Sequence, residues 1–219
     1  GVAFSSAELN ITADIFLPNT TPLQKINRIK YLLGSDKGIH ITGNTFNDCL
    51  TEALHYTSYK NKTFIHPYND IDVITGQGTI GIELFDDPTI KPDTIIGAIG
   101  GGGLMSGISL YGNNLYSKNI NSSSLDIHPN SLDIHSDSLD IHPNSLDNNL
   151  NIKNNIVYIG VEPIACPSMK ESIYKGFPVE LVPFDNFVDG ATVSRVGDKT
   201  FDICKNTIND IYTIQNGKI

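Results

Sequence analysis

Four consecutive glycines, Gly100 to Gly103, are the part of this sequence best suited to bind a ligand. They follow an apolar, β-branched segment at 94–99 and precede an apolar pattern, starting at Leu104, that is typical of a helix. Glycine has the largest conformational entropy to lose on folding, so a strand-to-helix junction rarely carries four without a function. Without Cβ atoms, successive backbone N–H groups can converge on one anion, and a helix N-terminus adds partial positive charge. The loop indicates a phosphate-type site, and the alternative is a flexible turn.

The segments that must position this loop alternate between strand and helix patterns. Such alternation is typical of an α/β fold with mostly parallel strands, whose ligands lie beyond the carboxyl ends of the strands. Ile156–Val161 is a continuous β-branched run, which favours a strand buried on both faces. We expect strands at 13–17, 38–42, 63–66, 94–99, 156–161 and 210–215, and helices at 1–9, 22–33, 46–59, 78–85, from 104, 167–174 and 199–208.

Residues 113–155 interrupt the alternation. They are rich in Asn, Ser and Asp, and they contain a seven-residue repeat that begins at 124–130. Prolines in the repeat argue against a coiled coil, and tandem copying explains its regularly spaced histidines better than a metal site does. We expect a low-complexity, disordered insertion between a helix and a strand, where a loop lengthens at small entropic cost.

The composition excludes several classes of protein. The net charge is −9, and the two arginines, Arg28 and Arg195, form no basic stripe of the kind that binds nucleic acid. No apolar run approaches the roughly 20 residues of a membrane span, and the first residues resemble no signal or transit peptide. The 3 scattered cysteines indicate free thiols in a reducing compartment. We therefore expect a soluble intracellular protein, cytoplasmic or organellar, that binds neither nucleic acid nor membranes.

An ordered set of short motifs extends over most of the chain. The motifs are 18–26, 43–46, 64–70, 76–83, 100–107, 160–163, 187–193 and 197–201. In order and spacing they resemble the threonine dehydratases (threonine ammonia-lyases), pyridoxal-phosphate enzymes with the tryptophan-synthase-β-like, or type II, fold. The resemblance implies two α/β domains with mostly parallel sheets. Residues 1–62 would be the remnant of the smaller domain, and 63–219 part of the larger, cofactor-binding one.

The resemblance also implies roles for individual residues. It assigns the phosphate of pyridoxal 5'-phosphate to the backbone N–H groups of Gly100, Gly101, Gly102, Gly103 and Leu104. Gly190 matches a glycine that passes near the cofactor ring, and a turn before a helix is the alternative. Glu162 matches a carboxylate that binds a cation in related serine racemases, but Ser168 stands where those enzymes have Asp. A solvated Glu at a strand end is the alternative. For Gln77 and His66 we expect structural roles, in a helix cap and a turn.

The implied activity is the β-elimination of L-threonine to 2-oxobutanoate and ammonia, in isoleucine biosynthesis. In that family the lysine that forms the Schiff base and the loop that grips the substrate carboxylate precede the segments matched here. We therefore expect no catalytic lysine in this chain, an inactive fragment, and an intact protein that is a homo-oligomer. The alternatives are a serine racemase or catabolic serine/threonine dehydratase, and a non-catalytic pseudoenzyme remnant.

Overall fold

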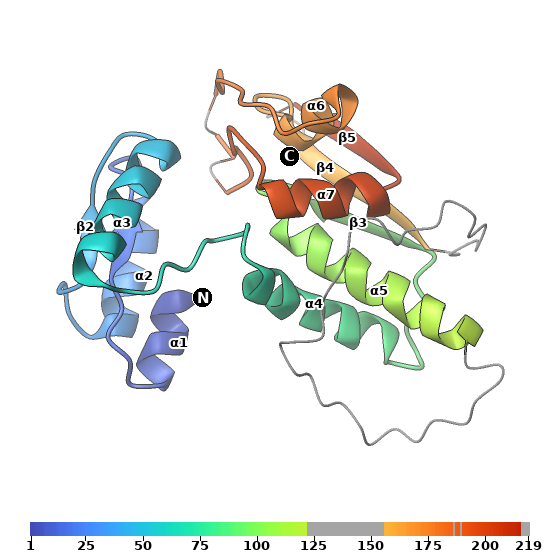
Figure 1. Cartoon of the computed structure of the whole chain (residues 1–219), viewed down its shortest axis with the longest axis horizontal. Coiled ribbons are helices and arrows are strands. Elements are labelled where there is room, and N and C mark those ends of the chain that lie inside the picture. The colour runs from blue at the N-terminus through green and yellow to red at the C-terminus, as the bar shows by residue number, and fades with distance from the viewer. Residues whose placement is uncertain (122–155, 186, 189, 216–219) are drawn as a thin grey trace. The chain divides into compact units, whose positions relative to one another are not determined.

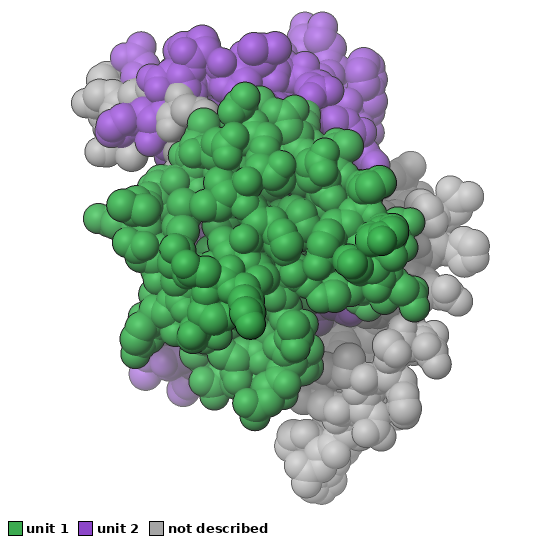
Figure 2. Space-filling model, turned by 90° about the vertical axis from the view of Figure 1, so that its left-hand side faces the viewer, with its two compact units in different colours: residues 1–65 green, residues 66–219 purple. Residues whose placement is uncertain are grey.

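The computed structural model describes residues 1–121, 156–185, 187–188 and 190–215. The chain divides into two compact units, residues 1–65 and residues 66–219, which Figure 2 colours separately. The segment 63–66, expected to be a strand, lies where one unit ends and the next begins, and this prediction was wrong. A strand needs a ladder partner, and the segment pairs with no strand among the described residues.

Unit 1 is a small parallel α/β layer. Its helices are α1 Val2–Glu8, α2 Leu23–Leu33 and α3 Phe46–Lys60, and its strands are β1 Ile15–Leu17 and β2 Ile39–Ile41. The strands pair in parallel, with Phe16 opposite His40. A capping box begins α3: the Thr45 hydroxyl accepts the Asp48 N–H, and the Asp48 carboxylate accepts the Thr45 N–H. Apart from the segment 63–66, every element expected in this unit is present, because apolar periodicity predicts each of them and a capping box marks the start of α3.

Unit 2 is built on a three-stranded parallel sheet in the order β3-β4-β5 (Figure 1). Its strands are β3 Thr94–Ala98, β4 Val157–Pro163 and β5 Asp210–Ile214. Its helices are α4 Ile71–Phe85, α5 Gly103–Asn121, α6 Ser168–Lys175 and α7 Asp198–Thr207. Helices follow strands along the chain, as expected of parallel strands joined by crossovers.

The core of unit 2 lies between one face of this sheet and the helices α5 and α7. Tyr158 of β4, Met105 of α5 and Cys204 of α7 are buried there. On the opposite face, Ile96 is 65% exposed and Tyr212 is 56% exposed. The expectation that the 156–161 run is buried on both faces was therefore wrong, because the described helices cover one face only.

Helices α4 and α5 lie side by side (Figure 1) and meet backbone to backbone. A Cβ atom on Gly107 would lie 2.6 Å from the Gly78 nitrogen, so Gly107 lets α5 pack closely against α4. The sequence predicted a helix over 78–85. Helix α4 instead begins at Ile71, where the Asp70 carboxylate accepts the Asp72 N–H and caps the helix.

Helix α5 continues to Asn121, so the first part of the segment expected as a disordered insertion, 113–155, is helical. Its remainder, including the repeat, lies outside the described residues. None of the described helices is both long and apolar enough to cross a bilayer.

Candidate functional site

The glycine loop lies at the carboxyl edge of the unit 2 sheet, where the sequence predicted it. The Ile99 N–H donates to Val161 O at 2.9 Å, which extends the ladder by one residue before the chain turns. Gly102 then adopts φ +94°, in the left-handed region that favours glycine, and α5 begins at Gly103. The first turn of the helix is closed by Ser106 N–H donating to Gly102 O at 3.0 Å.

The backbone N–H groups of this loop are available to a ligand. Within the described part of the chain, the amides of 100–104 donate to no acceptor, although Gly101, Gly102 and Gly103 are buried residues. Buried N–H groups in proteins are almost always paired, so the amides of the three buried glycines favour an acceptor that the described residues do not supply. The positive end of α5 lies at the same place. Together they favour an anion with several acceptor oxygens.

A side chain would overlap its neighbours at Gly101 and Gly102 and would be tightly packed at Gly100 and Gly103. A Cβ atom on Gly101 would overlap the ring of Tyr68, and one on Gly102 would lie 2.7 Å from Met169 Cε. A Cβ atom on Gly100 would lie 3.1 Å from Gly190 O. The structure thus brings Gly190 beside the loop. Gly190 is exposed, in a turn where Ala191 N–H donates to Val188 O, and α7 begins only at Asp198.

Glu162, the candidate cation ligand, lies near the end of β4 and is only 1% exposed. Its two carboxylate oxygens accept the N–H groups of Met169, at 2.8 Å, and Lys170, at 2.9 Å, and so cap the start of α6. The alternative of a solvated Glu was therefore wrong. Burial raises the pKa of this carboxyl to about 7, against the lowering effect of the two amide bonds.

A cation at Glu162 would compete with these two amides for the same oxygens. Ser168, where the related racemases have Asp, is buried as well. Among the residues that the structure describes, no three His, Cys, Asp or Glu side chains are grouped so that they could hold a metal ion. The observed role of Glu162 is to close the N-terminus of α6.

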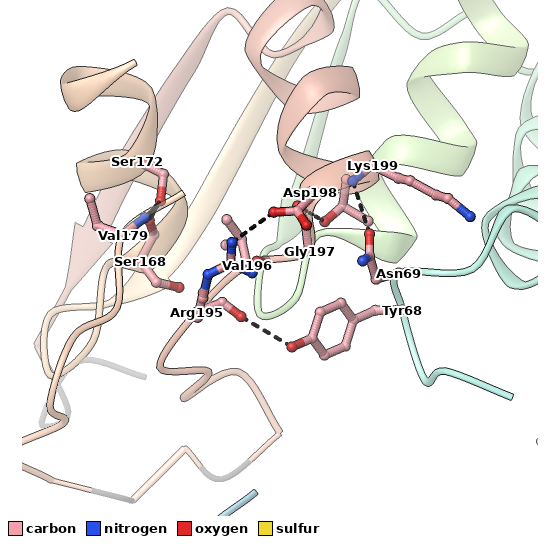
Figure 3. A network of polar contacts seen from close by, with 11 residues as sticks. Tyr68, Asn69, Ser168, Ser172, Val179, Arg195, Val196, Gly197, Asp198 and Lys199 are labelled. Carbon is pink, nitrogen blue, oxygen red and sulfur yellow. Dashed lines mark hydrogen bonds and ion pairs between the residues drawn. The ribbon is translucent and has the colours of Figure 1, made fainter. Parts of the chain in front are cut away.

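The segment before α4 ties the loop to α7 through Tyr68 and Asn69 (Figure 3). The Tyr68 hydroxyl donates to Arg195 O at 3.1 Å, and burial raises the pKa of this phenol to about 12. Asn69 Oδ1 accepts the Lys199 N–H at 2.9 Å, at the start of α7. His66 Nδ1 accepts the N–H groups of both Tyr68 and Asn69, which is the turn-closing role expected of it.

Sequence reasoning gave no role to Thr200, which the structure places directly under the loop. Thr200 is 0% exposed, and its Oγ1 lies 2.6 Å from Gly101 O. One signal was available: Thr200, Cys204 and Thr207 recur at helical spacing, and small polar residues on one face indicate close helix packing. Gln77, expected at a helix cap, lies within α4, where Asp70 is the cap.

The comparisons with known proteins agree with this geometry. L-threonine dehydratase biosynthetic IlvA of Staphylococcus aureus is 37% identical over 223 residues, covering 100% of this chain and 44% of that protein. The enzyme of the same name from Staphylococcus saprophyticus is 38% identical over the same length. The chain thus spans less than half the length of the curated relatives that it matches.

Solved structures show the same fold. The processed form of threonine deaminase isoform 2 from Solanum lycopersicum superposes with a TM-score of 0.72 at 30% identity, over 98% of this chain and 51% of that one. A second solved threonine deaminase, from T.th., gives a TM-score of 0.73 at 22% identity, over 99% of this chain and 58% of that one. The expected fold and the resemblance to threonine dehydratases are confirmed. The sequence model of one family matches residues 1–133, and the chain belongs to that family, the pyridoxal-phosphate dependent enzymes.

Proposed function

We propose that residues 100–104 bind the phosphate of pyridoxal 5'-phosphate, as part of a protein that converts L-threonine into 2-oxobutanoate and ammonia. The observation that carries the proposal is the run of five backbone N–H groups without an acceptor in the described chain, at the start of α5. The family match and the 37% identity to a biosynthetic threonine dehydratase support the choice of cofactor and substrate.

The loop residues would hold the cofactor by its phosphate. A phosphate dianion offers three acceptor oxygens, and each charge-assisted bond contributes roughly 1.5–3 kcal/mol. The chain carries a net charge of −9, but distant carboxylates are screened within about 8 Å at physiological salt, so the local amides dominate. The Gly190 turn would border the same ligand, because Gly190 O lies beside Gly100.

Bound pyridoxal phosphate supplies the electron sink for bond breaking at the substrate α-carbon. The described residues contribute orientation. Gly102 at φ +94°, the Tyr68 ring against Gly101 and the α4–α5 contact fix the amides before any ligand binds. Fixed donors lose little entropy on binding, so the phosphate is held in one place and the cofactor ring with it.

Titration of this chain with pyridoxal phosphate, followed by cofactor fluorescence, tests the phosphate assignment. Saturable binding is expected, with competition by inorganic phosphate and much weaker binding of pyridoxal, which has no phosphate. Equal affinity for pyridoxal and its phosphate would contradict the assignment. For the substrate, the intact protein should form 2-oxobutanoate from L-threonine faster than pyruvate from L-serine. The reverse order would exclude threonine as the preferred substrate.

A further inference from the structure

We propose that Thr200 is a positioning residue: its hydroxyl sets the orientation of the Gly101–Gly102 peptide and so directs the Gly102 N–H toward the cofactor phosphate. The inference rests on the proposed function, because it requires the loop to bind phosphate. Thr200 lies on α7, and it acts through the Gly101 carbonyl.

The first step of the argument is the partner of the Gly101 carbonyl. Thr200 Oγ1 lies 2.6 Å from Gly101 O and 3.1 Å from Gly197 O. A hydroxyl has one proton, so it donates to one of these oxygens at a time, and the shorter contact is to Gly101. Gly197 O already accepts the Phe201 N–H at 2.8 Å. No other donor among the described residues reaches Gly101 O, so this buried carbonyl depends on Thr200.

The second step is the geometry of the peptide. None of the described peptide bonds is cis, and in a trans peptide the C=O and N–H point in opposite directions. Because Gly101 O faces the Thr200 hydroxyl, the Gly102 N–H faces away from α7. That N–H is one of the five amides without an acceptor in the described chain. Thr200 therefore determines the direction in which this amide points.

The third step is the freedom of the loop itself. Glycine crosses between positive and negative φ with little steric cost, so a peptide flanked by Gly101 and Gly102 can reverse unless something holds it. The next peptide is held by α5, since Gly102 O accepts the Ser106 N–H at 3.0 Å. The sulfur of Cys204, 3.9 Å from Gly102 O, is too weak a donor to replace the hydroxyl of Thr200. Among the described residues, Thr200 is thus the one hydrogen-bond donor that holds the carbonyl of the Gly101–Gly102 peptide.

The test uses three variants of this chain. Thr200→Val keeps the shape and removes the hydroxyl, and Thr200→Ser keeps the hydroxyl. Thr207→Val is the matched control: it removes a hydroxyl from the same helix, one that lies 2.8 Å from Ser109 Oγ, well along the helix from the loop. Dissociation constants are measured for pyridoxal phosphate and for pyridoxal, and circular dichroism melts report folding.

We expect Thr200→Val to weaken binding of pyridoxal phosphate roughly tenfold and to leave pyridoxal unaffected, because one charge-assisted bond is lost. Thr200→Ser and Thr207→Val should stay within about twofold of the wild-type chain, whatever their melting temperatures. Wild-type affinity in Thr200→Val, an equal loss for pyridoxal, or an equal loss in Thr207→Val would overturn the inference.

A measurement on the wild-type chain covers the case in which Thr200→Val does not fold. In ¹H–¹⁵N spectra, inorganic phosphate should shift the Gly102 amide resonance downfield and leave that of Gly176, at the far end of α6, unchanged. If phosphate shifts the other loop amides but leaves the Gly102 resonance unmoved, the role proposed for Thr200 would be overturned. A wild-type chain that binds neither phosphate nor the cofactor would instead contradict the proposed function, and the inference would fall with it.

Discussion

Helices α5 and α6 of unit 2 both follow a strand of the same sheet, yet their first amides have different partners. At α6, the buried Glu162 carboxylate accepts the N–H groups of Met169 and Lys170. At α5, the corresponding amides follow a glycine loop and meet no acceptor in the described chain. The two helix N-termini at this sheet thus both carry partial positive charge, and the chain itself supplies acceptors for the amides of α6. A helix N-terminus therefore indicates a ligand only when its own chain leaves the amides unpaired.

The largest effect is expected at the start of α5, for Gly102→Ala. The new Cβ would lie 2.7 Å from Met169 Cε and 2.9 Å from Thr200 Cβ, at a backbone φ of +94°. Relief of this overlap displaces the amides, and we expect affinity for pyridoxal phosphate to fall roughly 100-fold in a fluorescence titration.

Gly176→Ala is the matched control for that variant. Gly176 has φ +85° but open space around it, so alanine there adds similar backbone strain without overlap. It should lower stability by about 1 kcal/mol and leave cofactor affinity unchanged. Equal loss of affinity in both variants would show that backbone strain alone, rather than the position of the loop, controls binding.

At the start of α6 we expect a change in stability rather than in binding. Glu162→Gln replaces one of two acceptor oxygens with an NH₂ group that faces an N–H donor, which should cost about 2 kcal/mol of unfolding free energy. Glu171→Gln removes a charge from the same helix turn without touching these bonds, so it should have little effect in urea denaturation. A weaker affinity for pyridoxal phosphate in Glu162→Gln alone would show that the two helix ends are not independent.

The Glu162 cap at the start of α6 should also make the free energy of unfolding depend on pH. Burial raises the Glu162 pKa from its ordinary 4.5 to about 7, so the folded chain binds this proton more tightly than the unfolded chain does. The contribution is therefore fully present below the unfolded pKa and is lost as pH rises through the folded one. Between about pH 5 and 7 this carboxyl should make unfolding easier with each rise in pH. The slope should vanish in Glu162→Gln, and an unchanged slope would assign it to another group.

The smallest effect on stability is expected at the N-terminus of α7, where the neutral side chain of Asn69 accepts a backbone N–H. Asn69→Ala removes the acceptor 2.9 Å from the Lys199 N–H and should lower the unfolding free energy by about 1 kcal/mol. Asn69→Asp keeps an acceptor oxygen and should retain wild-type stability. Thermal melts of both variants test this prediction. Equal melting temperatures for Asn69→Ala and the wild type would show that Asn69 does not stabilise the start of α7.

The sequence predicted the parts of this fold that depend on local patterns. The elements of unit 1 and the position of the glycine loop follow from apolar periodicity, capping residues and glycine content, which neighbouring residues determine. The start of α4 was missed because Gly76 and Gly78 lower helix propensity, although Gly78 lets α5 approach closely. The 63–66 segment was misjudged because a strand needs a partner, and no local pattern supplies one.

The site was predicted only as far as its own motif extends. The loop amides could be inferred from the glycines, but the burial of Glu162 depends on how α6 returns to the end of β4. The partner of the Gly101 carbonyl is Thr200, 99 residues further along the chain. Contacts of that range follow from tertiary packing, which a single sequence does not reveal.

The backbone contact between Gly78 and Gly107 has a consequence for motion. At this point no side chain separates α4 from α5, and one turn further on the Tyr111 side chain packs closely against Gly81, which leaves the helices little room to slide. Tyr68, just before α4, and Gly101, just before α5, therefore move as one body, with the ring held against the glycine. An incoming cofactor would therefore meet a preformed cradle.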